Sequence, residues 1–442
     1  MLKKKLTYKE TSNSRNAYFV SLELENIRCF GKKQKIVFSN GEGNPKQWTI
    51  ILGDNGTGKT TILQSLVGML PVPDMHGNIS VSVPNMPSRF LNIKTLTSKP
   101  KSQYYIEAFY SIQTSLSSPK KEIVNLTVEP LRDNNDPVYM ALWEVITMNC
   151  FAYGASRKTG DTSFSEQNEG SAYETLFDET FLLVNPGEWL LQADYAASKP
   201  SGFKQWALMR RDKVVEILKL ILPDVSDINF GSFRDDSKKP RVEFLTPYGW
   251  VESKNLSLGY RSSMAWIVDF VSRMFDIYPE SENPLAEPAV VIIDEIDLHL
   301  HPKWQRDLLP WLSDLFPNTQ FIVTTHSPLI VQAAVAREAN LVVCKLQDDH
   351  IVVDQSVEGF KNWRADQVLT SDFFDLPTAR PKEIEGLLKE KEKILSKPKL
   401  TKKDERRLKK LESEIGFLPV SEDSNEDEAM RIIKKAAEWL GN

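Results

Sequence analysis

Cysteine is scarce in this sequence: the 442 residues include only Cys29, Cys150 and Cys344, which lie far apart. No two of them form a CxxC pair, so the sequence suggests neither a disulfide framework nor a zinc site. We expect the three thiols to be core residues.

Long apolar runs are also missing. No stretch approaches the roughly 18 apolar residues of a membrane span. Three lysines near the N-terminus, at positions 3 to 5, are not followed by the apolar stretch of an export signal. We therefore expect a cytoplasmic protein with no membrane partner.

An excess of positive charge is absent as well, since the net charge is −5. Bulk electrostatics therefore gives no attraction to nucleic acid, although local basic clusters could still provide one. At 41% hydrophobic residues the chain has the composition of a globular protein, and its length allows two or three domains with a sizeable core.

The segment 48–60, WTIILGDNGTGKT, combines an apolar strand with the pattern GxxxxGK[ST], and an apolar helix follows it. Glycines let successive N–H groups point inward, and the helix adds the positive end of its dipole, so the segment predicts a phosphate-binding loop. Lys59 would reach the β and γ phosphates of ATP, and the Thr60 hydroxyl would bind Mg²⁺. The predicted nucleotide-binding residues are Gly53, Asp54, Asn55, Gly56, Thr57, Gly58, Lys59, Thr60 and Thr61.

Two further apolar strands end in polar residues. The segment 290–297, VVIIDEID, predicts a buried parallel strand; Asp294 would hold Mg²⁺ through water and Glu295 would polarise the attacking water. In QFIVTTHSPLI, His326 follows the strand 321–324, at the sheet edge where open α/β folds bind ligands, and would contact the γ phosphate. Glu295, His326 and Lys59 are the predicted catalytic residues, and Thr60 and Asp294 the predicted metal ligands.

A resemblance to a known family rests on the order of these motifs. ENIRCFGKKQKIVF before the phosphate loop, predicted as two strands joined across Gly31, resembles the opening of ABC-type ATPase heads of the SMC class. In those heads the corresponding arginine lies near the nucleotide, so Arg28 is either a nucleotide contact or an exposed strand arginine. TTHSP is similar to their switch-histidine motif.

The signature motif is degenerate. In NLSLGYRSSMAWIVDF, Leu256, Ser257 and Gly259 match three positions of LSGGQ, whereas Leu258 and Tyr260 depart from it. The resemblance makes Ser257 and Gly259 nucleotide contacts. DLHLHP, at 297–302, occupies the position of the D-loop, where we expect its two histidines to serve packing and an interface rather than a metal.

The whole order, over residues 18–335, resembles the compact ATPases of bacterial anti-phage and mobile-element systems, of the Septu or retron-associated type, which accompany an HNH nuclease. FAYGASR, LFDET and NPGEWLLQADYA add to it, and no long heptad insertion or hook cysteine pair is present. No nuclease constellation is seen in the sequence, so any cutting would belong to another chain.

The resemblance implies an α/β fold: a P-loop head with a mixed sheet, flanking helices, an antiparallel side sheet, a helical lobe and a helical C-terminal tail. It also implies Mg²⁺-dependent ATP hydrolysis, a head-to-tail homodimer or higher oligomer, and a separate effector; DNA or structured RNA is a further candidate partner. The alternatives are a DNA repair or recombination ATPase, an ABC transporter subunit, and a nucleotide-gated scaffold with little turnover.

The predicted organisation has five parts: a flexible arm at 1–17, an N-terminal lobe at 18–129, a helical lobe at 130–240, a C-terminal lobe at 241–360 and a charged helical region at 361–442. Gln113 is a weak candidate for the Q-loop glutamine. Arg157 follows a strand and a glycine turn, so it either touches phosphate or is solvated. Strands are expected over 104–111 and 122–128, and a closing hairpin over 341–356. Helices are expected after Asn185 and Pro186, over 203–222, and three times in the tail.

Overall fold

The chain divides into two compact units, Met1–Val368 and Leu369–Asn442, which are described separately. The computed structural model describes residues 17–73, 79–81, 111–117, 123–128, 148–160, 172–222, 224–231, 240–355, 363–371, 373–374, 376, 381–397 and 401–415. Most of the predicted N-terminal arm and the third predicted tail helix, at 430–440, lie outside these residues. None of the described helices is both long and apolar enough to cross a membrane.

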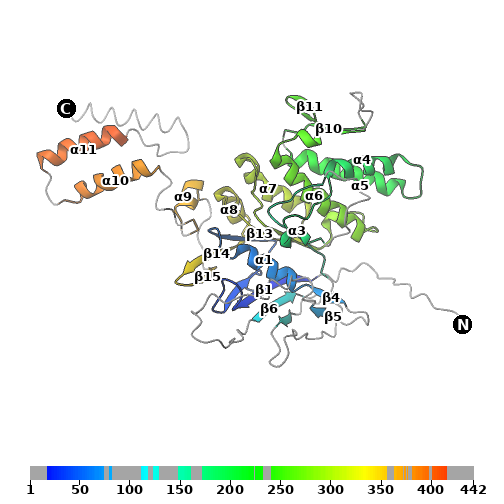
Figure 1. Cartoon of the computed structure of the whole chain (residues 1–442), viewed down its shortest axis with the longest axis horizontal. Helices are drawn as coiled ribbons and strands as arrows, with labels where there is room; N and C mark the ends of the chain where they lie inside the picture. The colour runs from blue at the N-terminus through cyan, green and yellow to red at the C-terminus, as the bar shows by residue number, and fades with distance from the viewer. Residues whose placement is uncertain are drawn as a thin grey trace. The chain divides into compact units, whose positions relative to one another are not determined.

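The centre of the first unit is a mixed sheet, of which β13, β14 and β15 are labelled in Figure 1. Its described strands run in the order β15-β14-β3-β13-β12-β8. All neighbours pair in parallel except β14 and β15, which form the predicted closing hairpin. The apolar residues of β3, β8, β12 and β13 are buried, as expected of strands covered on both faces, whereas Leu346 near the end of β14 is exposed. The bounds are β3 Trp48–Gly53, β8 Cys150–Tyr153, β12 Ala289–Ile293, β13 Thr319–Thr324, β14 Asn340–Gln347 and β15 His350–Asp354.

An antiparallel side sheet lies beside it, with the order β2-β1-β6-β7 among the described strands. Its strands are β1 Tyr18–Glu25, β2 Gln34–Val37, β6 Ser111–Ser117 and β7 Ile123–Val128. The predicted pair joined across Gly31 is β1 and β2. Gln320, on β13, ties the two sheets together: its side chain accepts from Phe19 N at 2.9 Å and donates to Phe19 O at 2.8 Å.

The predicted strand at 104–111 falls outside the described residues apart from Ser111, where β6 begins. Gln113 lies within β6, opposite Glu23 of β1. A short ladder pairs β4 (Pro71–Pro73) with β5 (Ile79–Val81), and a third sheet joins β9 (Asp227–Phe230), β10 (Val242–Thr246) and β11 (Gly249–Glu252).

Helices flank the central sheet. Asn185 begins α4 as predicted, because its side chain accepts from Gly187 N at 2.9 Å and Glu188 N at 3.4 Å and Pro186 follows it. The second predicted helix is α5. The described helices of this unit are α1 Lys59–Gly68, α3 Glu174–Phe177, α4 Pro186–Ser198, α5 Lys204–Ile221, α6 Leu258–Ile277, α7 Pro302–Leu315 and α8 Pro328–Val335, with α9 (Ala365–Leu369) at its end.

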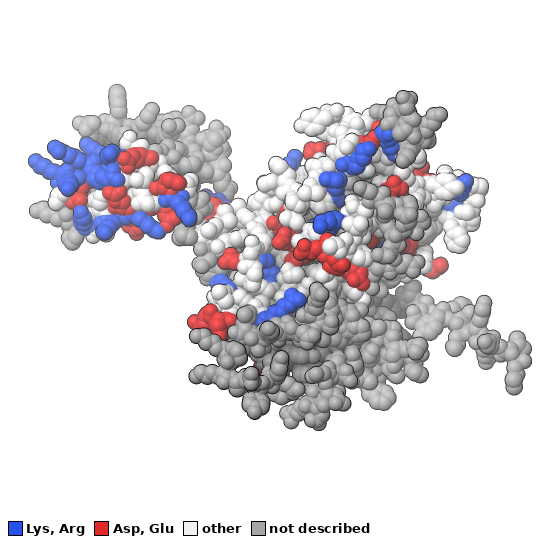
Figure 2. All heavy atoms as spheres, viewed as in Figure 1, with Lys and Arg blue, Asp and Glu red and all other residues white. Residues whose placement is uncertain are grey.

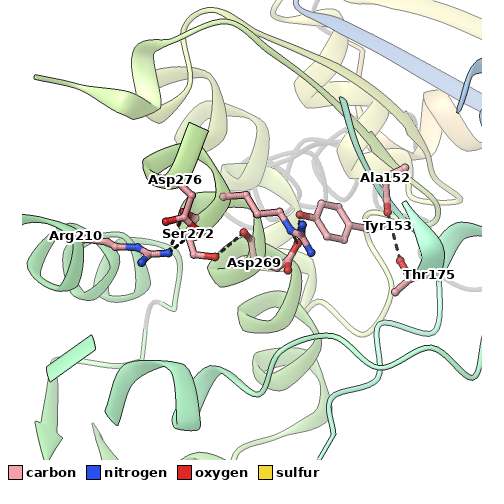
Figure 3. A network of polar contacts seen from close by, with 8 residues as sticks. Ala152, Tyr153, Thr175, Arg210, Asp269, Ser272 and Asp276 are labelled. Carbon is pink, nitrogen blue, oxygen red and sulfur yellow. Dashed lines mark hydrogen bonds and ion pairs between the residues drawn. The ribbon is translucent and has the colours of Figure 1, made fainter. Parts of the chain in front are cut away.

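Polar contacts join α6 to the sheet and to α5 (Figure 3). Tyr153, the last residue of β8, donates its hydroxyl to Asp269 Oδ2 at 2.8 Å, and Arg273 Nε donates to the same oxygen at 2.9 Å. Arg210 of α5 donates to Ser272 O at 3.1 Å and pairs with Asp276 at 2.9 Å. Burial and the Asp269 carboxylate raise the pKa of Tyr153 well above its ordinary value, so the hydroxyl stays protonated and remains a donor.

The second unit contains a helical hairpin of α10 (Lys382–Leu395) and α11 (Lys402–Ile415), as predicted from its apolar spacing. Leu387, Leu388 and Leu408 pack against the buried Ile394, Leu411 and Ile415. Arg407 reaches across to both carboxylate oxygens of Glu390, at 2.7 and 2.6 Å. Lys and Arg side chains gather on one part of the visible surface of this unit (Figure 2).

Candidate nucleotide site

The predicted phosphate loop lies between β3 and α1 and curls through left-handed backbone at Gly53, Gly56 and Gly58, with φ of 145°, 82° and 81°. A Cβ on Gly58 would lie 2.4 Å from Cys29 Sγ, and one on Gly53 would lie 2.5 Å from Cys344 O. A Cβ on Gly56 would meet nothing within 4 Å. Two of these glycines are therefore required for both space and backbone conformation, and Gly56 for conformation alone.

Lys59 lies buried inside this loop, where its ammonium donates to Gly53 O and Asp54 O, each at 2.8 Å. Burial lowers the pKa of Lys59 from its ordinary value, and the nearby carboxylates of Asp294 and Glu295 oppose that shift. Asp54, Asn55 and Gly56 are exposed at the rim. A cation inside a ring of backbone groups is the arrangement that a polyphosphate needs.

Hydrogen bonds of two hydroxyls and a carboxylate link α1 to the ends of β12 and β13. Thr60, on α1, donates to Asp294 Oδ2 at 2.7 Å, and Thr324, at the end of β13, donates to Asp294 Oδ1 at 2.5 Å. Thr324 Oγ1 also accepts from Glu295 N at 2.7 Å. A hydroxyl and a carboxylate are hard oxygen donors, the type that Mg²⁺ prefers, so Thr60 and Asp294 fit that ion.

Arg157 fits neither of the two roles considered from the sequence. Its side chain is buried, with a residue exposure of 3%, and it donates to backbone carbonyls: Gly154 O at 3.1 Å, Asp294 O at 2.6 Å and Glu295 O. Burial lowers its pKa to about 10, which leaves it charged at neutral pH. The position of Arg157 just beyond a predicted strand indicated a role at the edge of the sheet. Its contacts with Asp294 and Glu295 depend on the pairing of β8 with β12, which the residues around Arg157 do not predict.

His326 follows β13 and is exposed. Its backbone is fixed by Asp297, whose Oδ1 accepts from Thr325 Oγ1 at 2.5 Å and from His326 N at 3.4 Å. The D-loop and the switch segment are therefore tied together. His301 is exposed and caps α7, because its side chain accepts from Lys303 N at 3.3 Å.

Arg28 lies on the α1 side of the loop. It has left-handed backbone, with φ of 48°, and donates to Gln64 Oε1 at 3.0 Å and to Thr61 Oγ1 at 3.5 Å. Burial lowers the pKa of Arg28. This arginine is half-buried and bonded to the helix that follows the loop, so it is not a plain solvated strand residue.

The signature segment begins α6, and its departures from LSGGQ have local explanations. Ser257 is the N-cap and accepts from Tyr260 N at 3.4 Å. Leu258 is 51% exposed, so the position does not demand a small residue, whereas a Cβ on Gly259 would lie 2.3 Å from His299 O. Tyr260 donates to Asp224 at 2.8 Å. Within a single chain, Ser257 contacts α6 and Gly259 lies against the D-loop.

The fold and this site define a P-loop protein of the α/β class, with a mixed central sheet, flanking helices and an antiparallel side sheet. In the described part of the chain, no group of three or more His, Cys, Asp or Glu side chains has the arrangement of a metal site. Residues 201–332 match the family model "AAA domain, putative AbiEii toxin, Type IV TA system", and residues 21–71 match a second AAA domain model.

Two of the similar proteins are named as probable ATPases of retrons, and a third as a Septu protein. The chain is 25% identical to "Retron Vc95 probable ATPase" of Vibrio cholerae serotype O1 biovar El Tor, over 85% of this chain and 84% of that protein. It is 25% identical to "Septu protein PtuA" of Bacillus mycoides over 90% of this chain, but spans only 50% of that protein. "Retron Ec83 probable ATPase" of Escherichia coli is 51% identical over 75 residues, 17% of this chain and 14% of that protein.

These relatives confirm the resemblance to the Septu and retron-associated ATPases that the motifs predicted. Among solved structures, an SMC head domain from Thermotoga maritima covers 77% of this chain and 99% of its own, with a TM-score of 0.42 at 14% identity.

Proposed function

We propose that this protein binds ATP and hydrolyses it with Mg²⁺ at the site between β3, β12 and β13. The observation that supports this best is the hydrogen bond of 2.7 Å between Thr60 and Asp294, residues 234 positions apart. It joins the phosphate loop to the acidic strand, as a shared Mg²⁺ site requires. When bound, Mg²⁺ neutralises the charge that develops on the phosphates.

The protein side chains have separate roles in this proposal. The loop amides and Lys59 bind and orient the phosphates, and Thr60 and Asp294 hold the cation. Glu295 orients the attacking water and accepts its proton, while His326 contacts the γ phosphate. Arg28, beside Thr61, would steady the start of α1 near the nucleotide.

Phosphate release with ATP, with and without Mg²⁺, is the direct test. Wild type should release phosphate only with Mg²⁺, and Glu295→Gln should bind a fluorescent ATP analogue while releasing little phosphate. Glu280→Gln, which changes an exposed carboxylate in the turn after α6, is the matched control and should behave as wild type. Binding without turnover in wild type would favour the nucleotide-gated scaffold, and absence of both would refute the proposal.

We further propose that two copies close head to tail on ATP. Ser257 begins a 20-residue helix, and the N-terminal dipole of α6 would face the γ phosphate held by the partner copy. Glu295→Gln should therefore form a long-lived dimer with ATP, whereas Ser257→Arg should bind ATP yet remain monomeric. Light scattering with and without ATP measures this. An unchanged mass in Glu295→Gln together with normal hydrolysis in Ser257→Arg would exclude a composite site.

We propose anti-phage defence as the cellular role, with ATP state regulating a separate effector, for which an HNH nuclease is the candidate. The support is the similarity to a retron ATPase and to a Septu protein over 85% and 90% of this chain. The alternative is a DNA repair or recombination ATPase. An adjacent nuclease or reverse-transcriptase gene, and loss of plaque reduction with Glu295→Gln, would support defence; a chromosomal repair operon would contradict it.

Nucleic acid is the second partner that we propose, through one side of α11. Lys402, Lys403, Arg406 and Lys409 are exposed at helical spacing, and in the described part of the chain they make no ion pair. Most other cations of the hairpin are paired with acids. Fluorescence anisotropy with duplex DNA and with a structured RNA should show salt-sensitive binding that Lys402→Glu with Arg406→Glu weakens. Lys204→Glu, on α5, is the control; equal binding by both variants would refute this contact.

A further inference from the structure

Glu295 adopts a backbone conformation that a glutamate rarely takes, with φ of 51°. It follows β12, which lies between β13 and β8 in the sheet. From the β13 side, Thr324 Oγ1 accepts the Glu295 N–H at 2.7 Å. From the β8 side, Arg157 binds the Glu295 carbonyl. The peptide groups on both sides of this residue are therefore held by side chains from neighbouring strands, which can maintain a strained conformation.

Arg157 is an unusual choice for this contact, because all its hydrogen bonds in the described structure go to backbone carbonyls. Burying a guanidinium is costly, and its charge is compensated by three carbonyl dipoles together with the fields of Asp294, Asp297 and Glu295. Nη2 donates to the carbonyls of both acids, while Nε donates to Gly154 O. The planar guanidinium fixes these two donor directions relative to one another, which a lysine ammonium cannot do equally well.

The segment that carries Arg157 is itself anchored. Asp294 N donates to Tyr153 O at 2.8 Å, and the Tyr153 hydroxyl binds Asp269 of α6 (Figure 3). Gly154 N donates to Thr175 Oγ1 at 3.2 Å, and a Cβ on Gly154 would lie 2.1 Å from Thr175 O. The turn from β8 to Arg157 therefore has little freedom, so the arginine supplies a rigid reference point.

We propose that Arg157 is a positioning residue for hydrolysis: it holds the backbone of Asp294 and Glu295 so that the Glu295 carboxylate faces the attacking water. This rests on the ATP hydrolysis proposed above. Without the guanidinium, the Glu295 peptide can relax to a conformation with negative φ, which redirects its side chain. Nucleotide binding is retained, because the phosphate loop is unchanged and the Asp294 carboxylate keeps its hydrogen bonds from Thr60 and Thr324.

The test compares Arg157→Met, Glu295→Gln and the double variant by steady-state hydrolysis and by binding of a fluorescent ATP analogue. Arg157→Met should lower kcat about 100-fold, the scale expected for a misplaced catalytic group, with KM and binding within about threefold of wild type. If the arginine acts through Glu295, the double variant should be no slower than Glu295→Gln alone. A merely structural arginine would lower the double variant further.

Arg210→Met is the matched control, because Arg210 is a partly buried arginine that, like Arg157, donates to a backbone carbonyl, which for Arg210 is Ser272 O of α6. It should change thermal stability but not kcat. Should Arg157→Met not fold, Arg157→Lys, which keeps the charge, should lower kcat about tenfold at unchanged KM. A folded variant at Arg157 with wild-type kcat, or additive losses in the double variant, overturns the proposal. Absence of hydrolysis by wild type would instead refute the proposed function.

Discussion

Two buried threonines on the same strand, β13, allow a matched test of how the acidic site is held together. Thr324 Oγ1 donates to Asp294 Oδ1 and accepts from Glu295 N. Thr319, at the other end of the strand, is equally buried, but its hydroxyl has no hydrogen-bond partner among the described residues. Replacing either by valine keeps the size and the β-branched shape, so only the hydroxyl is tested.

The two valine substitutions should change the free energy of unfolding differently. Thr324→Val leaves one N–H and one carboxylate oxygen without their partner, and each orphaned buried group costs about 1–3 kcal/mol, so we expect a loss of about 3 kcal/mol in the free energy of unfolding. In a unit as large as Met1–Val368 this corresponds to a fall in Tm of roughly 4 °C. Thr319→Val removes a hydroxyl that is already unsatisfied, so stability should stay the same or rise by about 1 kcal/mol.

Urea unfolding followed by tryptophan fluorescence, in buffer free of nucleotide and Mg²⁺, measures both variants. Thr324→Ser keeps the hydroxyl and should recover most of the loss, apart from the small cost of the missing methyl group. If the two valine variants change stability equally, or if Thr324→Val is as stable as wild type, the hydroxyl does not hold the acidic site and the reasoning is wrong.

Three further predictions follow from close contacts and burial. Gly58→Ala should abolish nucleotide binding, because its Cβ would lie 2.4 Å from the Cys29 sulfur. Gly56→Ala has open space around its Cβ but a backbone φ of 82°, so it should weaken binding only several-fold. Equal binding by both variants in a fluorescence titration would contradict this. Gly259→Ala should destabilise the D-loop and lower Tm by several degrees, while Leu258→Ala, at an exposed position, should leave Tm unchanged in the same thermal scan. Burial raises the pKa of Cys344 to about 12, so its thiol should label slowly at pH 8 in native protein and fast in urea, as read by peptide mass spectrometry; equal rates would show that the thiol is not buried.

Local patterns in the sequence predicted those parts of the site that depend on neighbours in the chain. The phosphate loop, the acidic end of β12 and the helix start at Asn185 all follow from residues within a few positions of one another. The antiparallel pair across Gly31 and the β14–β15 hairpin are local in the same sense. For this reason the α/β class and most element positions could be predicted directly.

The role of Arg157 could not be predicted in this way. It depends on β8 pairing in parallel with β12, a strand about 140 positions later, with Ile293 opposite Tyr153. Short-range spacing carries no information about such a pairing. The demand for Gly259 likewise comes from a distant segment, because a Cβ there would lie 2.3 Å from the D-loop carbonyl of His299.

The buried hydrogen bond between Tyr153 and Asp269 has a consequence for how ATP hydrolysis is coordinated between the two nucleotide sites of the proposed dimer. Helix α6 begins at Ser257, which in the proposed dimer would face the partner copy's nucleotide, and its middle is bonded through Tyr153 to the segment that supports this chain's own Glu295. A displacement of α6 caused by the neighbour's ATP would therefore be transmitted to the water-activating residue of the other site. The two sites would then hydrolyse ATP together rather than independently. The Hill coefficient for ATP, measured in wild type and in Tyr153→Phe, reports whether the two sites are coupled through this hydrogen bond.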